Sequence, residues 1–413
     1  MRRAVSLVGI GDDGCAGLTS RAMNAITKAQ VLAGGERQLA FFPDFQGERV
    51  VFRDSLGAAI ERIAALAEEH NVCILASGDP LFYGIGGLVI KKLGAGHVEI
   101  IPQPSSMQLA FGRAGLTWDD AAFLSLHGRP LFGLATRLKR HSKAGMFTDP
   151  ENTPARIAAH LIAHGETAWQ AWLCEELGGP EERVRRFSIA ELAEVTDAAP
   201  LNVLVLIRTD PRWRPPSTIP FLHEDAFAKR MPKKGLITKR EVRLLSLAAL
   251  SLRPDSVVWD IGAGSGSVAI EAGLLAFEGR VYAVELDPEG VAICEDNVRT
   301  HGADNVRVVA GRAPEALADL EAPDAVFVGG SKGSMAAIIE TALERLHPGG
   351  RLCANAITLE NAGECYQAIR GRNLVPEVTL LQVSRAEPLA HYLRYEALNP
   401  IQIFAVTKPE ARS

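Results

Sequence analysis

Short apolar runs alternate with segments of helical periodicity along almost the whole chain of 413 residues. In the first half, the runs that we expect to form strands are 5–10, 72–77, 98–102, 122–127, 167–174 and 201–207. In the second half they are 256–262, 280–286, 306–311, 325–330 and 350–357, followed by 377–385 and 401–408. Strands that alternate with helices are typical of α/β folds with largely parallel sheets. No clear helix joins the last two runs, so we expect them to pair antiparallel at one sheet edge.

A proline-rich stretch, residues 209–220, separates the two halves. Prolines lack a backbone donor and stiffen the chain, so this stretch should not continue a sheet. We therefore predict two α/β domains, 1–208 and 221–413, with 209–220 as the linker. The glycine-rich loops of the two halves differ in spacing, which disfavours an internal duplication.

Composition and charge disfavour several classes of protein. The formal net charge of −5 and the pI of about 6.1 give no support to nucleic-acid binding. The six cysteines form no C-x-x-C pair and the ten histidines no H-E-x-x-H motif, so we predict buried, unpaired cysteines and no bound metal. No apolar run reaches the roughly 18 residues that span a bilayer, and the N-terminal run is too short for a signal peptide. We expect a cytoplasmic protein without membrane or nucleic-acid partners.

In the second half, a glycine-rich loop follows an expected strand and precedes an expected helix. Gly262, Gly264 and Gly266 allow a tight turn and a close approach of a ligand to the backbone. Dinucleotides place a pyrophosphate on such a loop, whereas S-adenosylmethionine (SAM) places an ammonium and a sulfonium nearby. Asp260 would repel the first and attract the second, and unit charges 4 Å apart at an effective dielectric near 20 interact by about 4 kcal/mol. This sign of charge favours SAM.

Two further segments fit a bound adenosine. Glu285 ends the next expected strand, at the distance where an acidic residue meets ribose hydroxyls in either ligand class. Gly311, Arg312 and Ala313 follow the third strand and would border the adenine. Thr238 either contacts the cofactor or caps the helix that we expect to begin at Lys239.

These motifs, D-I-G-A-G-S-G at 260–266, Glu285 and 311–317, resemble class I SAM-dependent methyltransferases with a seven-stranded, mostly parallel sheet. More narrowly, segments 237–250, 328–333 and 354–360 are similar to the C-15-methylating, decarboxylating domain of cobalamin biosynthesis. The N/D-P-P-Y motif of amino-group methylases is absent, since 328–331 reads V-G-G-S. The basic residues in 233–243 either lie in solvent at the start of a helix or border a site for a ligand with several carboxylates. They are Lys233, Lys234, Lys239, Arg240 and Arg243.

The first half carries another G-x-G-x-x-G pattern, at Gly9, Gly11 and Gly14. Taken alone it suggests NAD. Two aspartates, Asp12 and Asp13, lie inside the loop where a pyrophosphate would sit, and no acidic residue ends a clear second strand. A dinucleotide is therefore disfavoured.

The rest of this half is similar to the tetrapyrrole methylases, the two-lobed class III SAM enzymes. The resemblance is carried by segments 7–34, 76–86, 104–129, 148–158 and 174–186, and S-L-H-G-R at 125–129 is typical of the C-5-methylating branch. It implies SAM contacts from Gly9, Gly11, Ser77, Gly78, Asp79, Pro80, Phe82, Tyr83, Ser105, Ser106 and Leu126. His127 and Arg129 would lie on the substrate side. Alternatively, Ser105 only caps a helix and His127 is a polar core residue.

Together the halves resemble the fused C5,15-methylating enzymes of cobalamin biosynthesis. The resemblance implies methylation of precorrin-6B at C-5 and C-15, with loss of carbon dioxide from the ring C acetate, to give precorrin-8 with two SAM. It also implies a homo-oligomer. Rival interpretations are a nucleic-acid or protein methyltransferase, a fusion with an NAD(P) reductase, and a SAM-sensing scaffold.

The sequence does not identify the acid or base of this chemistry. Candidates for that role are Asp79, His127, Glu271 and His301. Candidates for binding substrate carboxylates are Arg113, Arg129, Lys234 and Arg243.

Overall fold

The computed structural model describes residues 4–53, 55–229 and 237–410. The chain forms two compact units, and neither is continuous in sequence. The first unit comprises Met1–Pro130, Ser142–Ala159 and Ala168–Pro211, and the second comprises Leu131–His141, His160–Thr167 and Arg212–Ser413. None of the described helices is long and apolar enough to cross a membrane.

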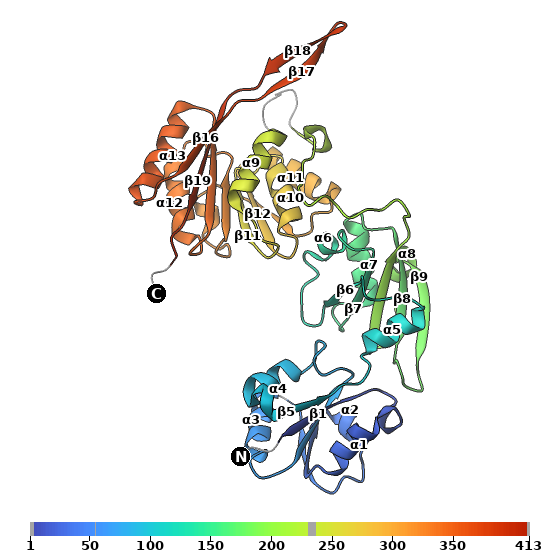
Figure 1. The fold of residues 1–413 in the computed structure, drawn as a ribbon. Coiled ribbons are helices and arrows are strands. Elements are labelled where there is room, and N and C mark those ends of the chain that lie inside the picture. The colour runs from blue at the N-terminus through green and yellow to red at the C-terminus, as the bar shows by residue number, and fades with distance from the viewer. Residues whose placement is uncertain (1–3, 54, 230–236, 411–413) are drawn as a thin grey trace. The chain divides into compact units, whose positions relative to one another are not determined.

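The first unit begins with a parallel five-stranded sheet in the order β3-β2-β4-β1-β5 (Figure 1). Its strands are β1 (Val5–Ile10), β2 (Val31–Gly34), β3 (Glu48–Val51), β4 (Val72–Ser77) and β5 (Val98–Ile101). Apolar residues of α1 (Ser20–Thr27) and α2 (Glu36–Ala40) pack on one face, and those of α3 (Leu56–Leu66) and α4 (Gly86–Leu93) pack on the other. Sequence reasoning missed β2 and β3, which have four residues each.

A second, mixed sheet of the first unit has the order β6-β7-β10-β8-β9. Its strands are β6 (Ala122–Ser125), β7 (Lys143–Phe147), β8 (Trp169–Glu175), β9 (Arg183–Ser188) and β10 (Asn202–Arg208). Met107 and Phe111 of α5 (Ser106–Ala114) pack against this sheet. The remaining helices before the proline-rich stretch are α6 (Leu134–Leu138), α7 (Pro154–Ala163) and α8 (Ile189–Ala193).

The second unit contains a seven-stranded sheet in the order β13-β12-β11-β14-β15-β19-β16. Its strands are β11 (Val257–Ile261), β12 (Arg280–Glu285), β13 (Val306–Ala310), β14 (Ala325–Val328), β15 (Arg351–Ala356), β16 (Glu377–Leu381) and β19 (Ile401–Thr407). The first five are parallel, whereas β19 is antiparallel to both β15 and β16. This confirms the mostly parallel sheet and the antiparallel pair at its edge.

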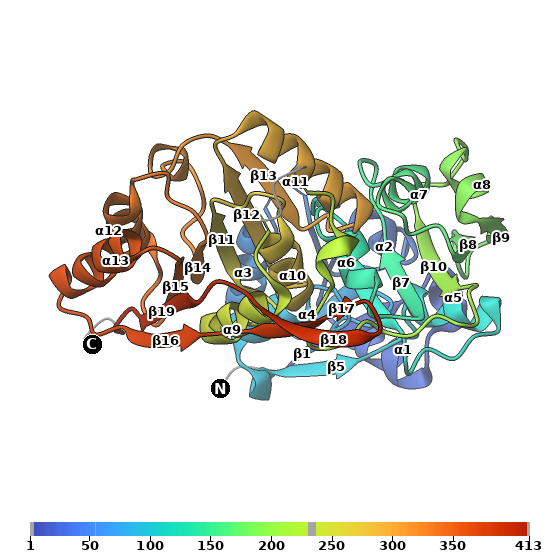
Figure 2. The ribbon, with the colours of Figure 1, turned by 90° about the horizontal axis from the view of Figure 1, so that it is seen from above.

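Helices cover both faces of the seven-stranded sheet (Figures 1 and 2). On one face lie α9 (Arg240–Leu250), α10 (Ser267–Leu275) and α11 (Pro288–Thr300), and on the other lie α12 (Met335–Arg345) and α13 (Leu359–Gly371). Successive residues of β11, such as Val258 and Trp259, point to opposite faces of the sheet and enter the two cores. Because β11 to β15 run parallel, they all end at one edge of the sheet, which we call the carboxyl edge.

The connection between β16 and β19 is a long hairpin, β17 (Ser384–Leu389) and β18 (Tyr392–Ala397), that extends beyond the sheet (Figure 1). The sequence interpretation of a plain polar connection missed this hairpin. Its side chains are almost all exposed, so no buried face gives it an alternating apolar pattern.

Candidate functional site

The glycine-rich loop of the second unit, residues 262–266, lies where β11 ends and α10 begins. Gly262 and Gly266 have φ values of +74° and +75°, which favour glycine. A Cβ on Gly262 would lie 2.5 Å from the carbonyl oxygen of Gly330, and a Cβ on Gly266 would lie 2.5 Å from Sγ of Cys294. The fold therefore requires glycine at both positions, and the loop contacts the segment that follows β14.

Glu285, the last residue of β12, holds this loop by its carboxylate. Its Oε2 accepts the N–H of Gly264 at 2.7 Å, and its Oε1 accepts the N–H of Asp287 at 2.8 Å. The N–H of Gly311 donates to the backbone oxygen of Glu285 at 2.9 Å. The carboxyl edge thus brings together the glycine loop, Glu285 and the segment 311–313, as expected from the order of the strands. Ribose and adenine contacts by these residues stay predictions.

Asp260 is a buried carboxylate beside the glycine loop. It is 1% exposed, and neither carboxylate oxygen accepts a hydrogen bond of normal geometry from a described residue. Burial raises its pKa to about 7; the nearby Ala269 N–H opposes this rise, and the Glu285 carboxylate adds to it. A buried carboxylate without a partner is costly. A ligand ammonium would remove that cost, so the two acidic side chains suit a cationic ligand and oppose a pyrophosphate.

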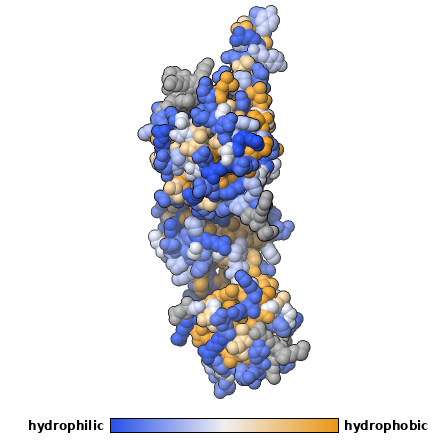
Figure 3. All heavy atoms as spheres, turned by 90° about the vertical axis from the view of Figure 1, so that its left-hand side faces the viewer, coloured by the Kyte–Doolittle hydropathy of each residue, from blue (hydrophilic) through white to orange (hydrophobic). Residues whose placement is uncertain are grey.

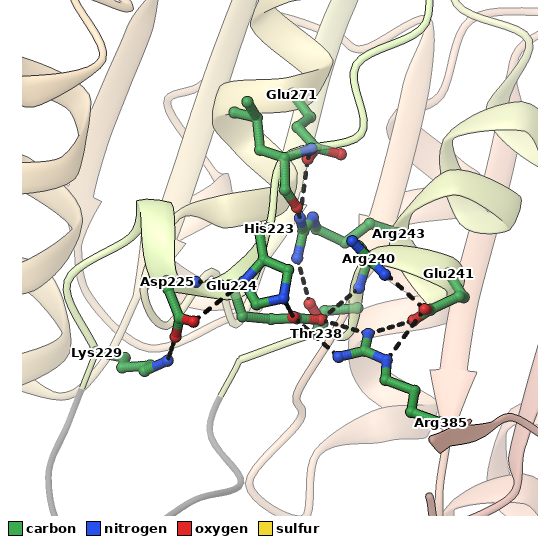
Figure 4. Close-up of polar contacts among 11 residues, drawn as sticks. His223, Glu224, Asp225, Lys229, Thr238, Arg240, Glu241, Arg243, Glu271 and Arg385 are labelled. Carbon is green, nitrogen blue, oxygen red and sulfur yellow. Dashed lines mark hydrogen bonds and ion pairs between the residues drawn. The ribbon is translucent and has the colours of Figure 1, made fainter. Parts of the chain in front are cut away.

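Arg243 and Glu271 form an ion pair inside the second unit (Figure 4). Both side chains are fully buried, with Nη2 of Arg243 2.9 Å from Oε1 of Glu271. Arg243 also donates to the backbone oxygens of Thr238 and Leu222, and the Leu222 N–H donates to Glu271 at 3.0 Å. The ion pair and the backbone bonds engage both side chains within the fold, so we leave Arg243 and Glu271 out of the proposed site. Substrate binding by Arg243 and an acid–base role for Glu271 stay predictions.

The start of α9 also differs from the expectation. Lys239 is the N-cap residue, without a side-chain capping bond, and the helix begins at Arg240. Since the N-cap position belongs to Lys239, the prediction that Thr238 caps this helix is wrong. The backbone oxygen of Thr238 accepts a hydrogen bond from Arg243. A cofactor contact by Thr238 stays a prediction, and Lys234 lies outside the described residues.

His301 follows the last residue of α11 and is held by contacts within the second unit. One turn earlier in α11, Nδ2 of Asn297 donates to the backbone oxygen of Ser265, in the glycine loop, at 2.8 Å. The Nε2 atom of His301 is 2.8 Å from the backbone oxygen of Ala226, and its ring packs 4.8 Å from that of Phe227. The ring is therefore already engaged by the fold, and an acid–base role for His301 stays a prediction.

In the first unit, three segments meet at the carboxyl edge of the parallel sheet. A Cβ on Gly9 would lie 2.0 Å from the carbonyl oxygen of Gly78, and a Cβ on Gly78 would lie 2.9 Å from Cα of Ser105. The N–H of Gly78 donates to the backbone oxygen of Ile10 at 3.0 Å. The ends of β1 and β4 and the start of α5 are therefore in backbone contact, and Gly11 follows in the turn after β1. This arrangement brings the predicted cofactor segments together.

The side chains of these segments also stabilise the fold. The Oγ of Ser77 accepts a hydrogen bond from Gln38 at 2.8 Å, and Oδ1 of Asp79 accepts the N–H of Leu81 at 2.8 Å. Ser105 caps α5 in a capping box with Gln108, so its role as a helix cap is confirmed, whereas the alternative that it only caps the helix is untested. Ser106 is the first residue of that helix. Ligand contacts by these residues, and an acid–base role for Asp79 beside Pro80, stay predictions.

Phe82 and Tyr83 belong to an aromatic cluster. Phe82 packs edge-on against Tyr83, Phe123 and Phe147. Tyr83 has a φ of +53°, which is uncommon for a bulky residue, and its hydroxyl donates to the backbone oxygen of Phe123 at 2.7 Å. The cluster fixes the loop after β4 against the second sheet of the same unit.

Sequence reasoning missed two side chains that hold the loop 126–129. Asn152 Nδ2 donates to the backbone oxygens of Leu126 and Arg129, at 2.8 Å each, and Asp149 Oδ2 accepts the N–H of Gly128 at 2.6 Å. Hydrogen bonds from Asn152 and Gly128 hold the pKa of the Asp149 carboxyl below its usual range. The only available signal was the turn-forming sequence T-D-P-E-N.

The substrate-side candidates of the first unit differ in their surroundings. His127 and Arg129 are exposed, so their substrate contacts stay predictions, whereas Leu126 is buried. Arg113 donates to the Glu182 carboxylate through two nitrogens, and this pairing lowers the pKa of Glu182. Its charge is already balanced, so we leave Arg113 out of the proposed site.

Asp304 holds the short helix α6 in place within the second unit. Its carboxylate accepts the N–H groups of Ala135 and Thr136 at 2.8 Å each, and Nε2 of His160 lies 2.8 Å from it. Burial alone would raise the pKa of Asp304, but the hydrogen bond from His160 and those from α6 hold this pKa below its usual range. Nδ1 of His164 bonds the backbone oxygen of His160 at 2.8 Å, and the three side chains have ligand atoms within 4.8 Å of one another. These bonds occupy the carboxylate as a helix cap, and we assign it no metal.

Family models match both parts of the chain. Residues 4–193 match the tetrapyrrole (corrin/porphyrin) methylases, and residues 229–408 match the precorrin methyltransferase domain.

Some curated relatives match nearly the whole chain, and others match less than half of it. The decarboxylating precorrin-6Y C(5,15)-methyltransferase of Sinorhizobium sp. is 34% identical over 410 residues, which cover 98% of this chain and 96% of the relative. Two Salmonella typhimurium proteins match shorter parts. Its cobalt-precorrin-7 C(5)-methyltransferase is 38% identical over 44% of this chain and 88% of its own length. Its decarboxylating cobalt-precorrin-6B C(15)-methyltransferase is 34% identical over 42% of this chain and 90% of its own length. The chain therefore belongs to the SAM-dependent, decarboxylating precorrin-6Y C(5,15)-methyltransferases.

Proposed function

We propose that this enzyme methylates precorrin-6B, also named precorrin-6Y, at C-5 and C-15 and removes carbon dioxide from the ring C acetate, giving precorrin-8 in cobalamin biosynthesis. The observation that carries the proposal is the buried, unpartnered carboxylate of Asp260 beside a loop that requires glycine. This pairing suits the cationic methionine end of SAM. SAM, when bound, supplies an electrophilic methyl group.

The chain itself has modest chemical tasks. A meso carbon between pyrrole-type rings is electron-rich, so the protein must hold it in line with the methyl donor, with reacting atoms about 3–3.5 Å apart. In the decarboxylation, the bond between the acetate methylene and its carboxyl breaks, the electron pair passes into the conjugated macrocycle, and the methylene takes up a proton. Holding this geometry is therefore the main catalytic task of the protein, and the decarboxylation also needs a proton donor.

We propose two SAM sites, one in each unit. In the second unit the site comprises Asp260, the glycine loop and Glu285. In the first unit it comprises the meeting point of Gly9, the turn after β4 and the start of α5. The support is that each unit has a carboxyl edge where backbone segments touch too closely for a side chain. The second unit would serve C-15 and the decarboxylation, and the first unit would serve C-5.

We also propose that the enzyme is a homo-oligomer. The hairpin β17–β18 carries apolar side chains that no described residue covers, interspersed with hydrophilic ones (Figure 3). These are Leu389, Tyr392, Leu393 and Tyr395, which are 52%, 69%, 73% and 78% exposed. Exposed apolar residues that gather on one segment are candidates for an association surface. A second copy of the chain would cover them.

The cysteines support a reducing compartment, and we propose the cytoplasm. All six are free, and five are buried. Cys15 is exposed, so the prediction that every cysteine is buried is wrong at that position.

Mass spectrometry of the full chain incubated with precorrin-6B and SAM tests the assignment. The wild type should add two methyl groups and lose carbon dioxide. The product of Gly264→Arg should carry one added methyl group and retain its carboxyl group. A Cβ at position 9 would lie 2.0 Å from the Gly78 oxygen, so Gly9→Val should block methylation by the first unit only. The product of Gly9→Val should therefore carry one added methyl group and lack the carboxyl group. Calorimetry with S-adenosylhomocysteine should find two sites in the wild type and one in each variant. Absence of methylation by the wild type, or binding of NAD(P)H to the first unit, would refute the proposal.

A further inference from the structure

The loop after β14 makes a tight turn with an unusual residue in it. The N–H of Ser334 donates to the backbone oxygen of Ser331 at 3.0 Å, and the two central residues, Lys332 and Gly333, have φ values of +48° and +83°. Two positive φ angles in succession are typical of a type I′ turn, whose first central position favours glycine, asparagine or aspartate. A lysine is strained there. Strain of this kind concentrates at functional sites.

Lys332 lies close to the glycine loop of the second unit. β14 pairs with β11 so that Val328 is the partner of Ile261, and Gly330 contacts Gly262. The side chain of Lys332 is exposed and forms no ion pair with a residue in the described parts of the chain. Its charge is therefore available to a ligand at the carboxyl edge.

Two exposed apolar residues follow the neighbouring strand. β15 runs parallel to β14, with Ala354 as the partner of Val328, so residues after β15 lie at the same edge as Lys332. Ile357 is 65% exposed and Leu359 is 81% exposed. Exposed apolar side chains beside an uncompensated cation fit a ligand that is flat and apolar at its centre and anionic at its periphery.

We propose that Lys332, Ile357 and Leu359 form the substrate-binding lip of the second unit. The apolar pair contacts the face of the macrocycle, and Lys332 is a positioning residue that binds a peripheral carboxylate. This inference rests on the proposed function, which supplies a tetrapyrrole with several carboxylates as the substrate. The carboxylate bound by Lys332 is one that the reaction retains. An ion pair to the departing carboxylate would stabilise the ground state and slow the loss of carbon dioxide.

Lys332→Gly separates charge from fold, because glycine adopts the left-handed turn without strain. We expect an unchanged or higher Tm, an increase of about tenfold in KM for C-15 methylation and a smaller change in kcat, as for the loss of one charge-assisted hydrogen bond. Lys332→Arg should restore most of the affinity, and C-5 methylation by the same chain should be unaffected. The matched control is Asn373→Gly. Asn373 has a φ of +58° and precedes β16, which runs in the same direction as β15, so it lies at the opposite edge.

A second pair of variants tests the apolar side of the lip. Leu359→Ser should raise KM for C-15 methylation about tenfold, whereas Val375→Ser, at a residue that is 73% exposed at the opposite edge, should leave KM unchanged. If KM is unchanged in both Lys332→Gly and Leu359→Ser while the wild type is active, the lip is disproved and the proposed function stands. A wild type that does not methylate precorrin-6B disproves the proposed function instead. Titration with S-adenosylhomocysteine should give equal affinities for wild type and variants, and weaker binding by Lys332→Gly would overturn the assignment to substrate.

Discussion

Replacing Asp260 by asparagine tests whether its carboxylate recognises a cation. The side chain is nearly isosteric, but the charge is lost. A charge–charge interaction at about 4 Å and an effective dielectric near 20 is about 4 kcal/mol, and the amide retains part of the hydrogen bonding. We therefore expect Asp260→Asn to weaken S-adenosylhomocysteine binding in the second unit by roughly 30- to 1000-fold at pH 8. Binding to the first unit should not change.

The pH dependence of this affinity is a sharper test. Because burial raises the pKa of Asp260 to about 7, the free protein binds a proton below that pH, and a cationic ligand must displace it. Wild-type affinity in the second unit should therefore fall about tenfold from pH 8 to pH 6, with proton release on binding at pH 6. The variant has no such proton, so its affinity should change only as far as the ligand itself titrates. Calorimetry in buffers of different ionisation enthalpy measures both effects.

The stability of the ligand-free protein provides an independent readout. A raised carboxyl pKa stabilises the fold at low pH, and this contribution is lost as pH rises through about 7. The rise from 3.8 to about 7 corresponds to about 4 kcal/mol, against a cost of about 1–3 kcal/mol for a buried amide without a partner. Asp260→Asn should therefore unfold at no lower urea concentration than the wild type at pH 8.

The affinity measurement decides the question. If the affinity for S-adenosylhomocysteine depended on pH in the same way in the wild type and in Asp260→Asn, the role of the Asp260 carboxylate in recognising a cation would be refuted.

Three further predictions, which use four substitutions, follow from the contacts. Glu271→Gln leaves its arginine partner charged and buried, and should reduce the free energy of unfolding of the second unit in urea by about 3–5 kcal/mol. Ser105→Ala should cost about 1 kcal/mol, as should Ser188→Ala at the matched capping box of α8; weaker S-adenosylhomocysteine binding in the first variant alone would assign Ser105 to the cofactor. Burial opposes ionisation of Glu224, but the Arg385 guanidinium holds its pKa at about 2. The resulting stability is present above pH 4.5 and is lost toward pH 2, so Arg385→Ala should lower Tm at pH 7 more than at pH 3.

The parallel part of the sheet in the second unit was predictable because its strands are short apolar runs, and helices follow β11, β12, β14 and β15. The glycine loops were also predictable, since the requirement for glycine is local. Strands β2 and β3 are only four residues long, and β17 and β18 bury no face, so neither pair produces a clear apolar pattern.

Residue roles that depend on tertiary packing could not be predicted. Arg243 and Glu271 lie 28 positions apart and meet only when α9 packs beside α10. In the sequence both look like surface charges, as most charged residues are. The contact between His301 and the backbone oxygen of Ala226 joins positions 75 apart, so it too depends on packing. Asp260, by contrast, was informative from its place at a strand end before a glycine loop.

The helix cap by Asp304 has a consequence for splitting the chain. If the chain were cut in the proline-rich stretch, residues 131–141 and 160–167 would remain in the amino-terminal fragment. These residues, however, belong to the second compact unit. The carboxyl-terminal fragment would then expose a carboxylate that has lost its amide donors, and α6 would lose the acceptor at its start. Fragments mixed after such a cut should recombine without a covalent link, and Asp304→Ala should weaken their association.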